Sequence, residues 1–279
     1  MVLALTIHFE DRSSSSLPFE VFTCKTIVKL ELFGFLIEEV PEDAFLPSLK
    51  SIVLESVNFF SLHGCAFEKL LSACPVLEDL AIYDLNWEQW KWSRKVTSRS
   101  LKRLTIERSE FDGFDGTDFG SITFDTPSVT RLDYSDFVPG SYPSVNLDSL
   151  VEANLSLIVT VDHTWDFNYA DENDHITSNP TNLFKGLKNV KIMNLLDQEI
   201  LEMFYLFRGA IPVFQNLVHL STVTISDHCW RGLLLLLNNS PNLETLTIEG
   251  TLHYDPIDCE CLSGYSFLLL CPVKLRFAI

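Results

Sequence analysis

The stretch Leu77-Glu-Asp-Leu80-Ala-Ile82 decides the fold, because its pattern, Leu-x-x-Leu-x-Leu with Ile, Val or Tyr tolerated, recurs along the chain. Four more clear copies are Leu49-x-x-Ile52-x-Leu54, Leu101-x-x-Leu104-x-Ile106, Leu187-x-x-Val190-x-Ile192 and Leu243-x-x-Leu246-x-Ile248. Looser copies are Val2-x-x-Leu5-x-Ile7, Ile27-x-x-Leu30-x-Leu32, Val129-x-x-Leu132-x-Tyr134, Glu152-x-x-Leu155-x-Leu157 and Leu220-x-x-Val223-x-Ile225. The nine steps between the middle apolar residues average about 27 residues. So constant a period predicts a stack of similar units.

This pattern and period are typical of leucine-rich repeats. Alternate apolar residues of each copy point inward on a short strand, and stacking of neighbours buries them. We therefore predict an α/β fold: a horseshoe-shaped solenoid of about ten repeats over residues 1–270. Its concave side is expected to be a parallel sheet, and its convex side a mixture of helices and loops. A separate segment is expected to begin at residues 271–279.

Three return segments between the copies have helical spacing. Phe67, Leu70 and Leu71 share one helix face within residues 65–74, and Pro75 ends that helix. Asp197 is expected to cap a second helix, and Asp227 a third that runs through Leu237.

The composition limits the classes of partner that the chain could bind and the cellular compartments in which it could act. The net charge of −18 argues against nucleic acid and against anionic membrane surfaces, because both require a basic face. No apolar run reaches the ~20 residues that span a bilayer, and the start has no basic secretion signal. Seven cysteines, an odd number and mostly isolated, suit reduced core thiols. We expect a cytoplasmic or nuclear protein that is not secreted.

Several phrases together resemble one family. They are Leu17-Pro-Phe-Glu-Val-Phe-Thr-Cys-Lys25, Leu46-Pro-Ser-Leu-Lys50, Leu70-Leu-Ser-Ala-Cys-Pro-Val-Leu-Glu-Asp-Leu80, Ser240-Pro-Asn-Leu-Glu-Thr-Leu246 and Cys271-Pro-Val-Lys274. They are similar to the repeat region of plant F-box proteins of the FBD/leucine-rich-repeat class. The resemblance implies a target-recognition subunit of a cullin-type (SCF) ubiquitin ligase. In that family an F-box holds the Skp adaptor, and the repeats are thought to hold the target.

The two ends of the chain depart from the family pattern. No F-box is visible, so we do not expect this chain alone to bind a Skp-type adaptor. Residues 271–279 resemble only the opening of an FBD segment. An alternative interpretation is a truncated relic without a selected function, since both ends expose apolar strands. The main hypothesis remains a protein-interaction module with an unknown protein target.

The outward positions of the strands supply the candidate binding residues. They are Ser51, Val53, Glu55, Asp79, Ala81, Tyr83, Arg103, Thr105, Glu107, Arg131, Asp133, Ser135, Asn154, Ser156, Ile158, Asn189, Lys191, Met193, Thr245, Thr247 and Glu249. A mixed-charge patch is expected around Tyr83, Arg103, Glu107, Arg131 and Asp133, because arginine and tyrosine are favoured at binding hot spots. The alternative is an ordinary solvated sheet face.

A secondary basic patch is the second candidate. It comprises Lys91, Arg94, Lys95, Arg99 and Lys102, with Trp87, Trp90 and Trp92 nearby. One interpretation is a dock for an acidic or phosphorylated partner. The other is a solvated loop whose tryptophans fold onto the core.

Metal and catalytic sites have weak sequence support. His253, Cys259, Cys261 and Cys271 lack the paired spacing of a zinc site, and Asp112, Asp115 and Asp118 lack the alternation of a calcium loop. No nucleophile elbow, phosphate-binding loop or His-Glu-x-x-His motif is present. We therefore predict no cofactor, no metal and no enzyme activity, with an enzyme assembled from distant repeats as a remote alternative.

Overall fold

The computed structural model describes residues 3–8, 17–37, 39–59, 66–84, 94–108, 120–159, 176, 178–197, 199–223, 230–249 and 274–278. Eleven strands form one sheet, in which every neighbouring pair is parallel. In spatial order these are β1 (Leu3–His8), β2 (Ile27–Phe33), β4 (Ser51–Glu55), β6 (Asp79–Tyr83), β8 (Arg103–Glu107), β10 (Arg131–Phe137), β12 (Glu152–Ile158), β13 (Ile192–Leu195), β14 (His219–Val223), β15 (Thr245–Glu249) and β16 (Lys274–Ala278). The predicted parallel stack is confirmed.

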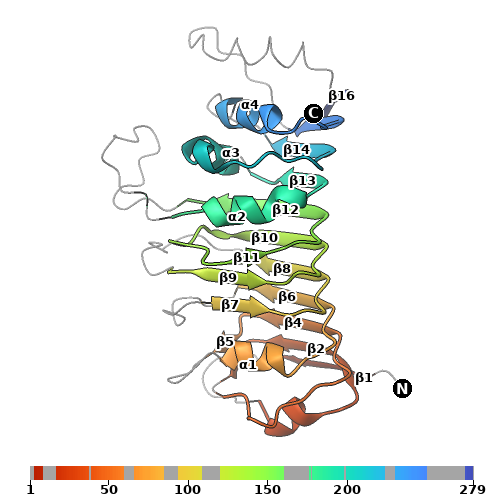
Figure 1. The fold of residues 1–279 in the computed structure, drawn as a ribbon. Helices are drawn as coiled ribbons and strands as arrows, with labels where there is room; N and C mark the ends of the chain where they lie inside the picture. The colour runs from red at the N-terminus through yellow and green to blue at the C-terminus, as the bar shows by residue number, and fades with distance from the viewer. Residues whose placement is uncertain are drawn as a thin grey trace.

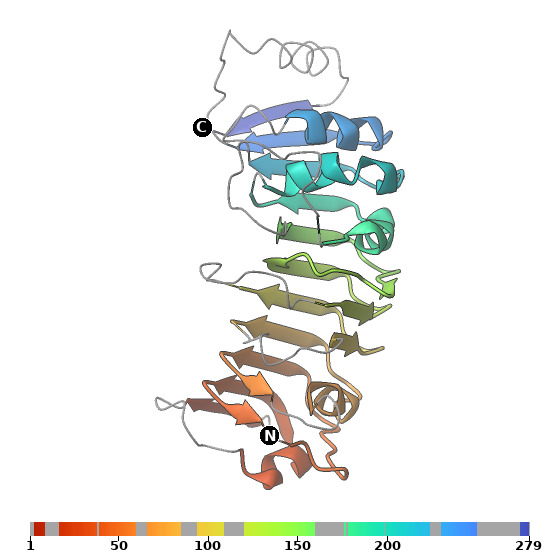
Figure 2. The same ribbon diagram turned by 90° about the vertical axis from the view of Figure 1, so that its left-hand side faces the viewer.

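The sheet follows chain order from one end to the other, which is the arrangement of a repeat stack (Figure 1). It neither closes nor curls on itself, so the predicted horseshoe is not confirmed (Figure 2). Strand β16 continues the sheet beyond β15. The expected domain boundary at 270/271 stays a prediction.

A second layer packs against one face of this main sheet (Figures 1 and 2). Its helices are α1 (Ala66–Ser72), α2 (Thr181–Gly186), α3 (Glu199–Leu206) and α4 (Trp230–Asn238), with short 3₁₀ turns η1 (Phe19–Thr23), η3 (Leu187–Asn189) and η4 (Arg208–Ala210). Its strands are β3 (Leu36–Ile37) with β5 (Asn58–Phe59), and β7 (Arg94–Thr97) with β9 (Ile122–Asp125) and β11 (Val145–Asn146). The prediction of helices and loops alone was therefore wrong in the middle of the chain, where return segments pair as strands.

The core lies between the two layers. Leu30, Ile52, Leu80, Leu104 and Leu132 occupy the same position on successive strands and are fully or almost fully buried. The second layer contributes side chains such as Phe67, Phe124, Phe184 and Phe204, which are buried as completely. Each repeat thus buries its apolar side chains only because its neighbours stack on it.

The register of the eighth and ninth repeats differs from the prediction. Met193, expected to point outward, is fully buried and pairs in register with Leu220. The strand phrase is therefore Val190-x-x-Met193-x-Leu195, three residues later than predicted, and the next phrase is centred on Leu220, not Val223. Two overlapping apolar phrases exist in each segment, and the first apolar residues lie buried in the preceding turn.

Helix ends follow local signals. Helix α1 buries Phe67, Leu70 and Leu71 as predicted and ends before Pro75. The predicted cap of α3 is confirmed, because the amide of Ile200 donates to Asp197 Oδ1 at 3.1 Å. Helix α4 is confirmed, whereas its expected cap, Asp227, lies outside the described residues.

Helices α3 and α4 approach very closely at Gly232. A Cβ built there would collide with the backbone oxygen of Leu201, so only glycine fits this contact. Among the described helices, none combines the length and the apolar composition needed to cross a bilayer.

Candidate protein-interaction surface

The face of the main sheet opposite the helices carries three rows of outward side chains, one residue per strand in each row. From β4 to β12 the first row is Ser51, Asp79, Arg103, Arg131 and Glu152; the middle row is Val53, Ala81, Thr105, Asp133 and Asn154; the last row is Glu55, Tyr83, Glu107, Ser135 and Ser156. Because parallel strands lie ~4.8 Å apart, neighbours within a row are in side-chain contact range.

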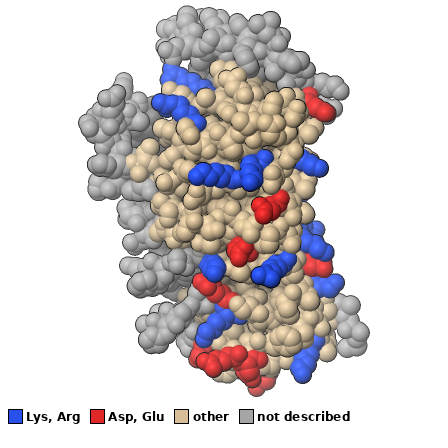
Figure 3. Space-filling view, in the orientation of Figure 1, with Lys and Arg blue, Asp and Glu red and all other residues tan. Residues whose placement is uncertain are grey.

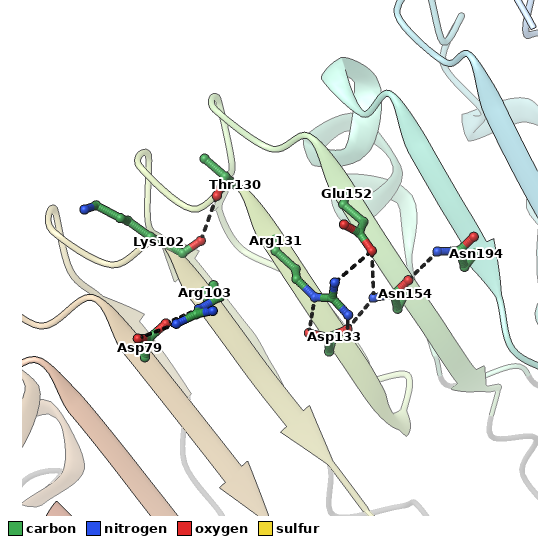
Figure 4. A network of polar contacts seen from close by, with 9 residues as sticks. All are labelled: Asp79, Lys102, Arg103, Thr130, Arg131, Asp133, Glu152, Asn154 and Asn194. Atoms are coloured by element: carbon green, nitrogen blue, oxygen red, sulfur yellow. Dashed lines mark hydrogen bonds and ion pairs between the residues drawn. The ribbon is translucent and has the colours of Figure 1, made fainter. Parts of the chain in front are cut away.

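Arg103 and Asp79 form a bidentate pair in the first row (Figure 4). The Arg103 Nη2 donates to Asp79 Oδ2 at 2.8 Å, and its Nε donates to Asp79 Oδ1. This hydrogen bond raises the pKa of Arg103, with the charge of Asp79 adding to it. The Arg103 side chain nevertheless stays 65% exposed, so the pair orients a guanidinium that remains accessible.

A second cluster spans β10, β12 and β13 around Arg131 (Figure 4). Arg131 Nε and Nη2 donate to Asp133 at 3.0 and 3.1 Å, and its Nη1 lies 3.0 Å from Glu152 Oε1. Asn154 donates to Asp133, and Asn194 donates to Asn154 Oδ1 at 2.6 Å. The result is a polar network in which each side chain fixes the next.

The turn before each strand adds a third set of charges. Glu78 lies between two lysines, 3.8 Å from Lys50 Nζ and 3.3 Å from Lys102 Nζ. The three side chains come from successive repeats and are all at least one third exposed. Such exposed ion pairs contribute little to the free energy of unfolding, so their main effect is on the distribution of charge over this surface.

The last row is arranged differently, around Tyr83. In register, Tyr83 lies between Glu55 and Glu107 on the two adjacent strands. Its partial burial raises its pKa, and the carboxylates of Glu107, Asp133 and Glu55 raise it further. The phenol is therefore neutral at physiological pH and surrounded by negative charge.

All five residues of the predicted mixed-charge patch lie on this face. Arg131 and Asp133 contact each other directly, Arg103 and Glu107 lie on the strand beside them, and Tyr83 is one strand further. The partners Asp79, Glu152, Asn154 and Asn194 were missing from the predicted patch. Asp79 and Asn154 could have been found, since the strand pattern already placed them outward. Asn194 could not, because the eighth repeat was read three residues out of register.

The predicted basic patch is not one surface in the described part of the chain. Lys95 lies on β7 in the second layer, whereas Lys102 precedes β8 of the main sheet and pairs with Glu78. Arg99 is exposed in the turn between these strands. Lys91 lies outside the described residues, and of Arg94 only the backbone is described.

The helix-bearing face shows no comparable order of charge. Lysines, arginines and acids are scattered over it with wide uncharged areas between them (Figure 3). The outward side chains in Figure 4 instead form two ordered clusters: Arg103 with Asp79 on β6 and β8, and Arg131 with Asp133, Glu152, Asn154 and Asn194 on β10, β12 and β13. The outward face of the main sheet is therefore the better candidate for recognition.

The residues considered for metals, His253, Cys259, Cys261 and Cys271, lie outside the described residues, as do Asp112, Asp115 and Asp118. Over the ranges that the structure describes, no group of three His, Cys, Asp or Glu side chains is placed to hold a metal ion. The absence of a metal or cofactor in the whole protein stays a prediction.

Comparison with known proteins supports the repeat assignment. Residues 2–142 match the family described as "FBD-associated F-box protein At5g56370, LRR repeats". Two relatives from Arabidopsis thaliana are 51% identical: F-box/LRR-repeat protein At3g62440, over 93% of this chain and 57% of the relative, and F-box/LRR-repeat protein At3g58980, over 93% and 45%. The Putative F-box/FBD/LRR-repeat protein At3g59240 of the same plant is 40% identical over 90% of this chain and 48% of its own length.

The chain spans about half of the length of these three relatives. No solved structure matches it. The family match extends over half of the chain, and high identity to the F-box/LRR-repeat proteins continues over nearly all of it. The predicted resemblance is thereby confirmed: the chain belongs to the leucine-rich-repeat family of FBD-associated F-box proteins.

Proposed function

We propose that this chain is the target-recognition region of an F-box-type protein and binds a protein target through the outward face of its main sheet. The observation that carries the proposal is the pair of ordered polar clusters, one on β6 and β8 and the other on β10, β12 and β13. It holds two arginines in fixed orientation while leaving them 65% and 45% exposed. Arginine side chains held in this way lose less conformational freedom on binding than free ones.

The proposed mechanism is binding without chemistry. In a cullin-type (SCF) ubiquitin ligase, ubiquitin transfer would be carried out by other subunits, and this region would bring the target to them. The Skp-type adaptor would bind an F-box and not the strands described above. We place this activity in the cytoplasm or nucleus, in keeping with the free thiols of Cys24 and Cys74.

The test is site-specific photo-crosslinking in plant-cell extract. A photoreactive amino acid at Thr105, in the middle row on the strand of Arg103 and beside the strand of Arg131, should capture a defined protein. The double variant Arg103→Ala/Arg131→Ala should reduce its yield about tenfold or more, because hot-spot arginines cost ≥2 kcal/mol each when truncated.

The matched control is Lys185→Ala/Arg208→Ala, which removes the same charge from the second layer. It should leave the yield at Thr105 unchanged. Equal capture by wild type and by both double variants would show that the sheet face does not recognise the target, and the proposal would then be wrong.

A further inference from the structure

The last row of the main sheet differs from the other two in charge balance. The basic side chains of the first row and of the preceding turns all have acidic neighbours: Lys50 and Lys102 share Glu78, Arg103 has Asp79, and Arg131 has Asp133 and Glu152. Glu55 and Glu107, in the last row, have no ion-pair or hydrogen-bond partner among the described side chains. The excess charge of this face is thus negative and lies along one row.

The described cation that follows Glu107 directly in sequence does not neutralise it. Arg108 turns under the sheet, where it is only 13% exposed, and its Nε donates to the buried Asp136 at 2.7 Å. Its guanidinium also lies over the ring of Phe137, 5.7 Å from the centroid. Arg108 therefore belongs to the interior, and no described side chain pairs with the carboxylate of Glu107.

The geometry around Tyr83 fits one particular cation. Two strand spacings, roughly 10 Å, separate the backbones of Glu55 and Glu107, and the partly exposed Tyr83 lies on the strand between them. The middle-row neighbours are the short side chains Val53, Ala81 and Thr105, so nothing long stands beside the ring on that side. A planar guanidinium lying on the ring would have donors facing both carboxylates, whereas an ammonium is a point charge.

We propose, building on the function proposed above, that Tyr83, Glu55 and Glu107 bind an arginine side chain of the target protein. The guanidinium lies on the Tyr83 ring and donates hydrogen bonds to Glu55 on one side and Glu107 on the other. The arginine belongs to a segment that crosses the main sheet, and the exposed Leu196 that follows β13 gives an apolar contact for the same segment. The preferred target segment is therefore basic at one end and apolar at the other.

The test uses the whole chain and a defined probe, the capped pentapeptide acetyl-Gly-Ser-Arg-Ser-Gly-amide. Tyrosines are replaced by 3-fluorotyrosine, and the fluorine resonance of Tyr83 is assigned with Tyr83→Phe. Titration should shift this resonance saturably, with a dissociation constant in the range of about 1–10 mM expected for a single exposed contact. The same peptide with citrulline, which keeps the shape and loses the charge, should not shift it, and the lysine peptide should bind about threefold more weakly.

Because the chain carries a net charge of −18, a matched control must separate this site from general attraction. Glu55→Gln/Glu107→Gln should weaken binding about fivefold to tenfold. Glu42→Gln/Asp148→Asn makes the same change of charge at exposed positions off this row and should bind as wild type does. The proposal is overturned if no saturable shift occurs, if the citrulline peptide shifts the resonance equally, or if the two double variants lose binding alike.

Failure of this proposal can be told from failure of the proposed function. If a target is captured at Thr105 and its yield is unaffected by Glu55→Gln/Glu107→Gln, the recognition face is right and the arginine site is wrong. If no target is captured while the peptide still binds at Tyr83, the cation site exists and the recognition function is what fails.

Discussion

The middle of the molecule and its C-terminal third build the same sheet in two different ways. From β7 to β11 the return segments are strands that form a small second sheet, whereas from α2 to α4 they are helices. The outward face differs as well: β6 to β12 carry ion pairs, while the first two rows of β13 to β15 consist of Ile192, His219, Thr245, Asn194, Ser221 and Thr247. The comparison teaches that the inward leucines determine the stack, while return segments and outward residues vary independently of it.

The largest effect on stability is expected from Phe124→Ala in β9. This substitution tests whether the return segments that form strands pack as tightly as the return segments that form helices. Phe124 is fully buried, with ring centroids 5.8 Å from Tyr134 and 6.2 Å from Tyr142. Removing the ring should lower the free energy of unfolding in urea by about 3–5 kcal/mol. Phe124→Leu keeps most of the volume and should cost no more than about 1.5 kcal/mol. A loss below about 1 kcal/mol for alanine would show that the small sheet is not part of the core.

Gly232→Ala tests the corresponding contact between helical returns. The added methyl group meets the backbone of Leu201 on α3, which cannot move aside as a side chain can. We expect a loss of about 2–3 kcal/mol in the free energy of unfolding. Gly209→Ala in η4 is the control, because a Cβ there meets nothing within 4 Å, and it should change stability by less than about 0.5 kcal/mol. Equal stability of both variants would contradict the close packing of α3 on α4.

The same contrast explains how far the sequence could predict the fold. For the strands from β2 to β10, the sequence alone predicted which residues point inward and which point outward, because a single Leu-x-x-Leu-x-Leu phrase occurs in each repeat. The register of β13 could not be predicted, because this segment contains two overlapping phrases, Leu187-x-x-Val190-x-Ile192 and Val190-x-x-Met193-x-Leu195. Only the pairing of Met193 with Leu220 on the next strand shows that the second phrase forms the strand. The strand β9 was missed although Ile122 and Phe124 alternate with polar residues, because it lies outside the repeated phrase.

The candidate site was predictable to the same degree. The five patch residues were found from strand alternation alone, because alternation fixes which side of the sheet a residue faces. Asp79 and Asn154 could be placed on the same face in this way, but the pairing of particular side chains required knowledge of how far each strand is shifted along its neighbour. Asn194 joins the network only in the register that the sequence left ambiguous.

A smaller effect is expected from Asp197→Ala, which removes the cap at the start of α3 in the helical third. Asp197 accepts a hydrogen bond from the amide of Ile200 and another from Ser156 of β12. Loss of the cap should cost about 1 kcal/mol in the free energy of unfolding. Asp197→Asn retains an acceptor oxygen and should cost less than half as much. If both variants lose the same amount, the charge of Asp197 matters and its role as an acceptor does not.

The smallest effect on stability is expected from Arg103→Ala, which compares the charged strands in the middle with the first two rows of β13 to β15, where no Lys, Arg, Asp or Glu is present. The Arg103–Asp79 pair is exposed, so solvent screens it, and its loss should change the free energy of unfolding by less than about 0.5 kcal/mol. Thr245→Ala, at the same row position on β15, should be equally mild. The two variants should differ in binding, however: Arg103→Ala should reduce crosslinking of the target at Thr105, and Thr245→Ala should not. A large loss of stability in Arg103→Ala would mean that the ion pairs hold the strands together, and the argument that they are oriented for a partner would fail.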